Sequence, residues 1–409
     1  MPGKFALPEL NNIRRLILPS LAIYIGLVFL MPRTGHAWDT ACWGMWSTRI
    51  QSGGLAAAYT AGSPVNYLPL YLYVLKLYGL IFASDEIYRH LYLLKAFTLI
   101  FDMGSVLLLC SMIKPTTKRL KYFIYALLNI GFIYNTLVWN QVDGILTFFV
   151  FASFYFGMHK RISLSFLMYL LALNFKLQAI VFLPLLFLVW LPDLKLRHVW
   201  TLLLPGILLQ LLIILPFMIH GNASHILEVA SGSVDYFSLI SLNAFNFWHL
   251  ILDGDLMKMR DNVSFIGGLT YKHAGLILFM IFSALICVPL YVRVLAHMIR
   301  KQAVQFDMRI MLLAFSLIAC FFFYFNTQMH ERYIHPLIIF STALAFLYRY
   351  WAQWVVFSTA YALSLESICQ YLQFPNYNTL IFSPDFIACL YGISILLLLN
   401  YWFRNYKSI

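Results

Sequence analysis

The chain has 409 residues, of which 62% are hydrophobic and 11% charged, and its mean hydropathy of +0.79 excludes an ordinary soluble domain. Its formal charge of +12 is divided among short basic clusters at the ends of apolar runs, which does not indicate a nucleic-acid-binding surface. Apolar runs near the ~20 residues that a spanning helix needs predict an all-α, polytopic transmembrane bundle. We interpret residues 1–409 as one membrane domain.

The predicted spans follow the apolar runs. We place them at residues 12–32, 90–113, 120–138, 143–158, 162–174, 177–192, 199–219, 272–292, 310–326, 333–350, 352–372 and 383–403. With the N-terminus in the cytoplasm, most basic residues fall on the inner side, among them the Lys114 to Lys121 cluster. The positive-inside rule expects this bias. The pattern therefore predicts about 10 to 12 spans with both termini cytoplasmic.

One apolar segment, residues 67–82, does not fit this alternation. Counted as a span, it would place the Lys114 to Lys121 cluster outside. We therefore predict an interfacial or re-entrant helix in a long first outer loop, residues 33–89. Its tyrosines would be interface anchors, namely Tyr67, Tyr71, Tyr73 and Tyr78. A second outer loop is predicted at residues 220–271.

Asp39 follows the first predicted span directly, in a loop that Trp38, Trp43 and Trp46 would hold at the membrane interface. A carboxylate in this place, facing acceptor hydroxyls from the aqueous side, can serve as a general base. An ordinary solvated loop aspartate is the alternative.

Two further aspartates lie within or beside predicted spans. Asp102 is well inside the second span, where an ionised carboxylate is expensive, so it is either functional or paired with a neighbouring helix. Asp143 ends the segment Trp139-Asn140-Gln141-Val142-Asp143 between two spans. We favour Asp143 as a cap of the next helix over a substrate contact, because a side-chain oxygen there would satisfy free N–H groups.

Lys176 lies at the predicted outer tip of a short hairpin, with Gln178 two residues later. As a phosphate partner it would act as a point charge. A lysine in this position can also extend to the interface without any other role.

The segment His330-Glu331-Arg332-Tyr333 places a carboxylate and two possible cations in one turn between spans. Arg332 offers a planar fork of donors to phosphate oxygens, and His330 can exchange a proton near neutral pH. A structural Glu331–Arg332 pair is the alternative. Asp253-Gly254-Asp255 matches a metal-binding pattern of nucleotide-sugar enzymes, but three residues are a weak match.

With these residues the chain resembles the GT-C superfamily of integral-membrane glycosyltransferases, and most closely the bacterial relatives of the GPI mannosyltransferases. The family pattern has an outer-loop aspartate, then Tyr-Pro-Pro-Leu-Tyr, Trp-Gly-Gln-Val-Asp, Phe-Lys-Pro-Gln-Ala, Asn-Ala-Phe-Asn and a late His-Glu-Arg-Tyr. The corresponding positions here are Asp39, Tyr67 to Tyr71, Trp139 to Asp143, Phe175 to Ala179, Asn243 to Asn246 and His330 to Tyr333. Leu68, Asn140 and Leu177 depart from the pattern.

The resemblance implies transfer of one sugar, a hexose such as mannose or glucose, from a polyprenyl-phosphate carrier to a glycan, lipid or protein acceptor outside the cytoplasm. It implies inversion at the anomeric carbon, Asp39 as the base, and Lys176, His330 and Arg332 on the donor phosphate. Further residues would bind or position substrate: Glu331, Tyr333, Asp143, Gln141, Trp139, Gln178, Tyr67 and Asn246. We expect neither a cofactor nor a metal.

The rival hypothesis is a carrier or flippase for a lipid-linked or anionic solute, in which Lys176, Arg332 and Asp102 line a pathway. We also expect a bacterial inner membrane, although Asn222-Ala223-Ser224 and Asn262-Val263-Ser264 have the form of glycosylation acceptors.

Overall fold

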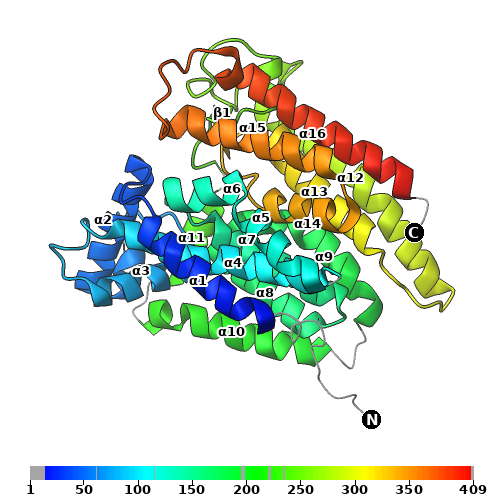
Figure 1. Cartoon of the computed structure of the whole chain (residues 1–409), viewed down its shortest axis with the longest axis horizontal. Helices are drawn as coiled ribbons and strands as arrows, with labels where there is room; N and C mark the ends of the chain where they lie inside the picture. The colour runs from blue at the N-terminus through cyan, green and yellow to red at the C-terminus, as the bar shows by residue number, and fades with distance from the viewer. Residues whose placement is uncertain are drawn as a thin grey trace.

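The computed structural model describes residues 14–60, 62–114, 116–194, 199–219, 223–233 and 235–406. The start of the first predicted span and Asn222 lie outside these residues. Helices occupy the positions of the predicted spans, and Figure 1 shows them in chain order. They are α1 (Arg14–Leu30), α4 (Leu94–Met112), α7 (Asp143–Met158), α8 (Ile162–Phe175), α9 (Leu183–Trp190), α10 (Val199–Ile219), α12 (Tyr271–Ile299), α13 (Met308–Phe325), α14 (Leu337–Tyr348), α15 (Trp351–Cys369) and α16 (Pro384–Asn405).

In the described part of the chain, five helices are long and apolar enough to cross a membrane. They are Leu91–Met112, Val199–Ile219, Tyr271–Ile299, Met308–Phe325 and Pro384–Asn405. The protein is therefore a helical integral membrane protein, as its composition predicts.

The predicted continuous span at residues 120–138 is wrong, because three helical pieces replace it. These are α5 (Arg119–Leu127), α6 (Ile130–Phe132) and the π-helical turn η5 (Ile133–Val138). The side chain of Asn129 accepts a hydrogen bond from the Gly131 amide at 2.8 Å and so starts a new helix. After this break η5 ends at Val138, and Trp139, the next residue, contacts the predicted first outer loop at His36.

The first outer loop folds into α2 (Ala37–Gly53), the 3-10 helix η2 (Leu55–Tyr59) and α3 (Pro69–Ile81). Trp43 on α2 meets the rings of Tyr67 and Tyr71 edge-on, with centroids 5.2 and 4.9 Å apart. The helix at residues 67–82 thus exists as predicted. The prediction that Tyr71 and Tyr78 anchor the protein at the membrane interface is wrong. Both side chains are buried inside the protein.

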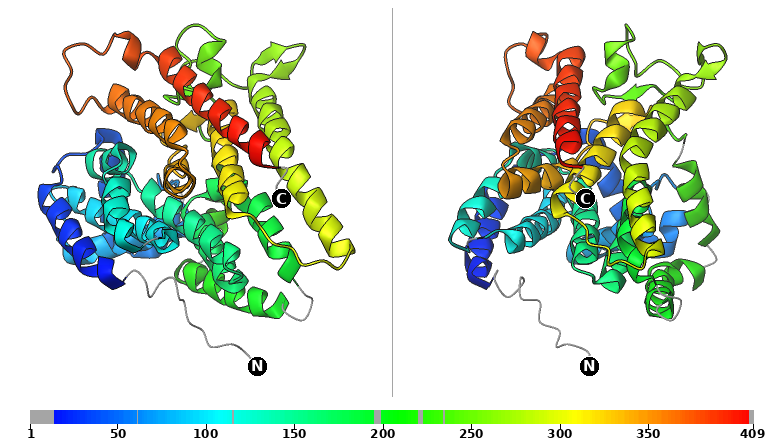
Figure 2. Two further views of the ribbon diagram at one scale, coloured as in Figure 1. Left: turned by 45° about the vertical axis from the view of Figure 1, so that its right-hand side comes forward. Right: turned by 90° about the vertical axis from the view of Figure 1, so that its right-hand side faces the viewer.

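The predicted second outer loop, residues 220–271, contains α11 (Ala223–Gly232), η9 (Phe247–Leu250) and three short strands. Strand β1 (Ser241–Leu242) pairs in parallel with β4 (Met329–His330), and β2 (Ser264–Ile266) pairs antiparallel with β3 (Leu269–Thr270). In both views of Figure 2 the part of this loop after α11 and the connection from α15 to α16 lie at the upper edge, away from the connection between α12 and α13. The β1–β4 pairing fastens the loop to the turn before α14.

The centre of the bundle is an aromatic core shared by α7, α13 and α14. The ring of Phe315 lies 4.9 Å from that of Phe154 and 5.3 Å from that of Phe340, and all three are buried. Because rings in such contact are closely packed, this core holds the middle of α13 against α7 and the start of α14. Short 3-10 segments complete the fold: η3 (Leu91–Leu93), η4 (Thr116–Lys118), η6 (Leu177–Phe182), η7 (Leu191–Asp193) and η10 (Leu380–Phe382).

Candidate active site

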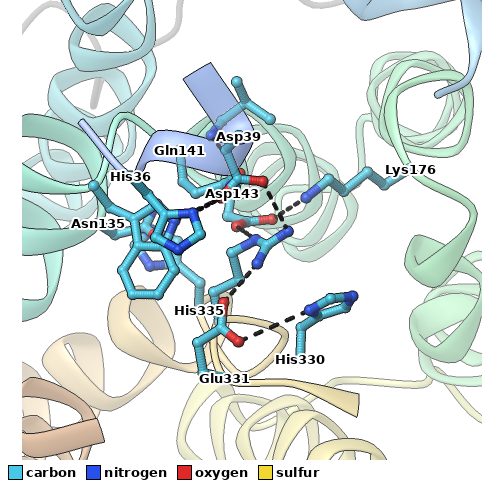
Figure 3. Close-up of polar contacts among 12 residues, drawn as sticks. His36, Asp39, Asn135, Gln141, Asp143, Lys176, His330, Glu331 and His335 are labelled. Atoms are coloured by element: carbon cyan, nitrogen blue, oxygen red, sulfur yellow. Dashed lines mark hydrogen bonds and ion pairs between the residues drawn. The ribbon is translucent and has the colours of Figure 1, made fainter. Parts of the chain in front are cut away.

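Asp39 lies in the first turn of α2, and two side chains hold one of its carboxylate oxygens. Its Oδ2 accepts hydrogen bonds from Trp139 Nε1 at 2.7 Å and from His36 Nδ1 at 3.0 Å (Figure 3). The residue is only 8% exposed. Asp39 is therefore not the solvated loop aspartate of the alternative hypothesis, because its carboxylate is fixed inside the protein.

Two of the sequence motifs meet at this carboxylate. The His36 amide donates to the Trp139 carbonyl at 2.8 Å, and the His36 ring stacks on the Trp139 ring with centroids 4.6 Å apart. Asn140 follows at φ 70°, a left-handed conformation that asparagine and glycine adopt more readily than other residues. The departure at Asn140 from the glycine of the family pattern therefore leaves this backbone shape available.

Arg332 lies at the centre of the site, between three carboxylates. Its Nη1 lies 2.5 Å from Glu331 Oε1, its Nη2 lies 3.7 Å from Asp39 Oδ1, and its Nε lies 3.5 Å from Asp143 Oδ2. The planar guanidinium can satisfy several acceptors at once, whereas an ammonium group could not bridge all three directions.

Lys176 forms the second ion pair of the site, with its Nζ 2.5 Å from Asp143 Oδ1 (Figure 3). Its ammonium also faces the rings of Tyr67 and Tyr333, at 5.2 and 5.9 Å from their centroids. Lys176 lies at the break between α8 and η6, where the hairpin tip was predicted, and it is only 9% exposed there.

Asp143 is not the helix cap that we predicted. It is the first residue of α7, and no side-chain cap hydrogen bond is present there. Both of its oxygens instead face basic groups, Lys176 and Arg332, and the residue is fully buried. A buried carboxylate requires such compensation.

His330 is placed by backbone pairing. Leu242 of β1 is its partner in the parallel strand pair, and Asn243 forms an isolated bridge with it. Its Nδ1 lies 3.8 Å from Glu331 Oε2, and its ring contacts Phe237 and Tyr333, with centroids 5.5 and 5.0 Å away. The predicted second outer loop thus orients a titratable side chain toward Glu331.

Most of these residues, though not Asp143, line one cavity of about 1000 Å³. The predicted site residues on its wall are Asp39, Tyr67, Trp139, Lys176, Gln178, His330, Glu331, Arg332 and Tyr333. Apolar residues from η6 and from α12 and α13 also line it: Ile180, Val181, Leu276 and Phe322. Polar and apolar ligand groups could therefore bind side by side.

The protonation of the site follows from burial and from Arg332. Burial opposes ionisation of Asp39, yet Arg332 and the donors His36 and Trp139 hold the pKa of its carboxyl far below the usual range. Burial lowers the pKa of His330, and the positive charge of Arg332 lowers it further. Asp39 is therefore a firmly ionised carboxylate, and His330 is neutral at pH 7.

Three predicted site residues do not line the cavity: Asp143, whose ion pairs are described above, Gln141 and Asn246. Gln141 is buried, and its Oε1 accepts from the Val142 amide at 3.2 Å. Asn246 is also buried, and its Nδ2 donates to the carbonyls of Phe323 and Asn326 at 3.1 and 3.2 Å. Asn246 therefore fastens the second outer loop to the end of α13, next to the turn that carries Arg332.

The remaining acidic candidates lie apart from the cavity wall. Asp102 accepts a hydrogen bond from Thr136 of η5 at 2.6 Å. This agrees with the prediction that Asp102 is paired with a neighbouring helix. Asp255 forms an exposed ion pair with Lys258 at 2.9 Å. Among the described residues, no three His, Cys, Asp or Glu side chains come together as a group that could hold a metal ion.

Sequence reasoning missed two residues next to this site. His36 has no role in the predictions above, although a histidine three residues before an aspartate at a helix start can form a pair with it. Lys95, on α4, is completely buried, and its Nζ donates to the carbonyls of Pro32, Thr34 and Leu137 at 2.9, 2.5 and 2.6 Å. It joins the segments that carry His36 and Trp139.

No protein-family model matches this chain, and no curated protein matches it. Any assignment of function therefore depends on the geometry of the site.

Proposed function

We propose that the protein is a membrane glycosyltransferase that moves one sugar from a polyprenyl-phosphate carrier to an acceptor hydroxyl. The observation that carries the proposal is the placement of Asp39, Lys176 and Arg332 on one cavity that also has an apolar wall. A lipid-linked anionic donor needs cations and apolar surface together. Transfer to a hydroxyl also needs a carboxylate at the reacting carbon.

The reaction would be a single displacement. The acceptor oxygen bonds to the anomeric carbon, the bond from that carbon to the phosphate oxygen breaks, and the electron pair stays on the phosphate. Arg332 and Lys176 would stabilise the charge that the phosphate gains. Activation of the acceptor depends on Asp39, the base that the family resemblance implies.

The low basicity of Asp39 is compatible with this role. A hydroxyl that is bonding to an anomeric carbon becomes strongly acidic, so deprotonation late in the reaction does not demand a strong base. A carboxylate that stays ionised also stabilises the positive charge that develops on the sugar ring. Arg332 keeps Asp39 in this state.

The donor phosphate would enter a site in which the basic groups already have partners. Asp39, Asp143 and Glu331 face Lys176 and Arg332, which leaves one carboxylate in excess. His330, the neighbouring imidazole, can supply the missing positive charge by taking up a proton. The prenyl chain would lie along Ile180 and Leu276, which are 50% and 46% exposed on segments that the bundle leaves partly uncovered.

The reaction would take place on the outer face of a bacterial inner membrane, because the cavity is built from both predicted outer loops. This placement depends on the positive-inside bias of the basic residues. The acceptor on that face would be a glycan, a lipid or a protein.

The test is a panel of polyprenyl-phosphate hexoses incubated with purified protein in lipid nanodiscs, with donor and product followed by mass spectrometry. Asp39→Asn should lower turnover at least about 100-fold, the usual scale of proton-transfer catalysis. Asp255→Asn is the matched control, because that aspartate is exposed and does not line the cavity. If no donor is consumed while labelled lipid crosses the membrane of proteoliposomes, the carrier hypothesis is correct instead.

A further inference from the structure

Three exposed aromatic side chains line the cavity besides the charged residues of the site. Trp38 on α2 is 75% exposed, and Tyr236 and Phe237 of the predicted second outer loop are 55% and 39% exposed. Tryptophan side chains are highly buried on average in folded proteins. A tryptophan this exposed on the wall of a cavity therefore indicates a contact with a ligand or with the membrane.

Two elements bring these aromatic residues next to the reaction centre. Trp38 directly precedes Asp39 in the first turn of α2. From the predicted second outer loop, the Phe237 ring meets the His330 ring edge-on with centroids 5.5 Å apart, and the Tyr236 ring meets the Phe237 ring with centroids 4.7 Å apart. A ligand that presents a hydroxyl to Asp39 would therefore share the cavity with aromatic surface from both predicted outer loops.

The other charged side chains on the cavity wall are already paired. His225 Nδ1 lies 2.6 Å from Glu228 Oε2 on α11, and Lys272 Nζ lies 2.5 and 2.7 Å from the two carboxylate oxygens of Asp235. In the part of the wall that the structure describes, His225, Glu228 and Lys272 are the only basic or acidic side chains outside the reaction centre. A wall whose charges are paired favours a neutral ligand over a charged one.

We infer that this part of the cavity is the acceptor subsite and that the acceptor is a neutral glycan, whose terminal sugar ring stacks on Trp38. This inference rests on the proposed function and names its acceptor class. A pyranose ring has C–H groups on its faces and hydroxyls around its edge. The C–H groups fit the negative face of an aromatic ring. The hydroxyls need donors and acceptors, which the Asn66 amide and the Glu228 carboxylate supply on the cavity wall.

The two other acceptor classes fit this wall less well. The prenyl chain of the donor would already use the aliphatic surface at Ile180 and Leu276, so a lipid acceptor would need more such surface beside Asp39. A peptide has N–H and C=O groups along its whole length that need partners, whereas the indole of Trp38 offers one donor and no acceptor. The bond changes are those of the displacement described above, with a ring hydroxyl of the bound sugar as the nucleophile and Asp39 as its proton acceptor.

The experiment offers three kinds of acceptor together with the donor that wild type consumes: methyl hexopyranosides and hexose disaccharides, a peptide that contains serine and threonine, and diacylglycerol. Mass spectrometry should find product with the sugars alone. Trp38→Ala should raise the KM for the sugar acceptor about 10-fold with the donor KM unchanged, and Trp38→Tyr should keep most of the affinity. Trp200→Ala is the matched control, because Trp200 is 71% exposed and does not line the cavity.

The outcomes separate this inference from the proposed function. Donor consumption with transfer only to the peptide or only to diacylglycerol would overturn the glycan acceptor and leave the glycosyltransferase standing. An unchanged acceptor KM in Trp38→Ala, or a defect that varies only with the lipid composition of the nanodisc, would make Trp38 a membrane anchor and overturn the stacking contact. Wild-type protein that consumes no donor with any acceptor would overturn both.

Discussion

The guanidinium of Arg332 lies 3.7 Å from the carboxylate of Asp39, so the turn before α14 completes a site that begins in the first turn of α2. Neither group could be buried alone at low cost, because an isolated ion inside a protein loses its hydration. Each is retained because the other is present, and the donor phosphate would have to bind within this balance of charges.

Arg332→Lys should be a severe substitution although it keeps the charge. An ammonium on a flexible stem cannot face Asp39, Asp143 and Glu331 at once as the guanidinium does. We expect kcat/KM for the donor to fall at least about 10-fold, equivalent to about 1.4 kcal/mol. Steady-state turnover by mass spectrometry measures this. Wild-type kinetics in the lysine variant would show that one charge, without the planar fork, is sufficient.

Lys176 and Asp143 should be energetically coupled. Lys176→Met leaves a buried carboxylate facing only Arg332, and Asp143→Asn leaves a buried ammonium without its partner, so each single change should cost about 3 to 5 kcal/mol. The double variant should cost clearly less than the sum. Thermal unfolding of the wild type, both single variants and the double variant in one detergent measures this double-mutant cycle. Strict additivity would mean that the 2.5 Å contact contributes nothing.

Donor binding should strengthen as the pH falls. Burial and Arg332 lower the pKa of His330, so the ring is neutral at pH 7 and gains its charge only under more acidic conditions. An anionic donor favours the charged ring, so affinity should rise from about pH 7 to about pH 5, and His330→Gln should abolish this slope.

Calorimetric titration in buffers of different ionisation enthalpy measures the number of protons that the protein takes up when the donor binds. Wild-type protein should take up protons when the donor binds, and His330→Gln should take up none. The groups that face His330 are Glu331, Arg332 and Asp39, and none of these carboxyl or guanidinium groups gains or loses a proton in this range. Equal proton uptake by both proteins would place the titrating group elsewhere.

Lys95→Met should destabilise the protein and lower its activity. The change leaves the carbonyls of Pro32, Thr34 and Leu137 without their donor in a buried place. Each buried acceptor left unsatisfied costs about 1 to 3 kcal/mol. Lys258→Met is the control, because that side chain is 84% exposed. A melting temperature equal to that of the control would show that the three carbonyls find water instead.

Much of the fold could be predicted because long apolar runs leave few alternatives to helices. The helix α10 and its predicted span share the same bounds, and so do α7 and its span. Breaks inside apolar runs are harder to predict, since they depend on one side chain: the cap at Asn129 interrupts the run at residues 120–138. The burial of Tyr71 and Tyr78 depends on α2 folding over α3, which no local pattern indicates.

The site was predictable where a polar residue stands out against an apolar background, as Asp39, Lys176 and Arg332 do. Their partners were not, because pairing is a tertiary property. Asp143 has the sequence position of a helix cap, and only the approach of η6 and the turn before α14 makes it an ion-pair partner. Among the residues that the structure describes, Lys95 contacts three carbonyls and no carboxylate, so a search for opposite charges could not find it.

The most direct test of the central claim is single-turnover sugar transfer by the protein in nanodiscs, with donor binding measured on the same sample. We predict that wild-type protein forms product from a polyprenyl-phosphate hexose. We also predict that Asp39→Asn binds the donor with similar affinity but forms product at least about 100-fold more slowly. Product formation at the wild-type rate by Asp39→Asn would contradict a reaction centred on the Asp39–Arg332 pair.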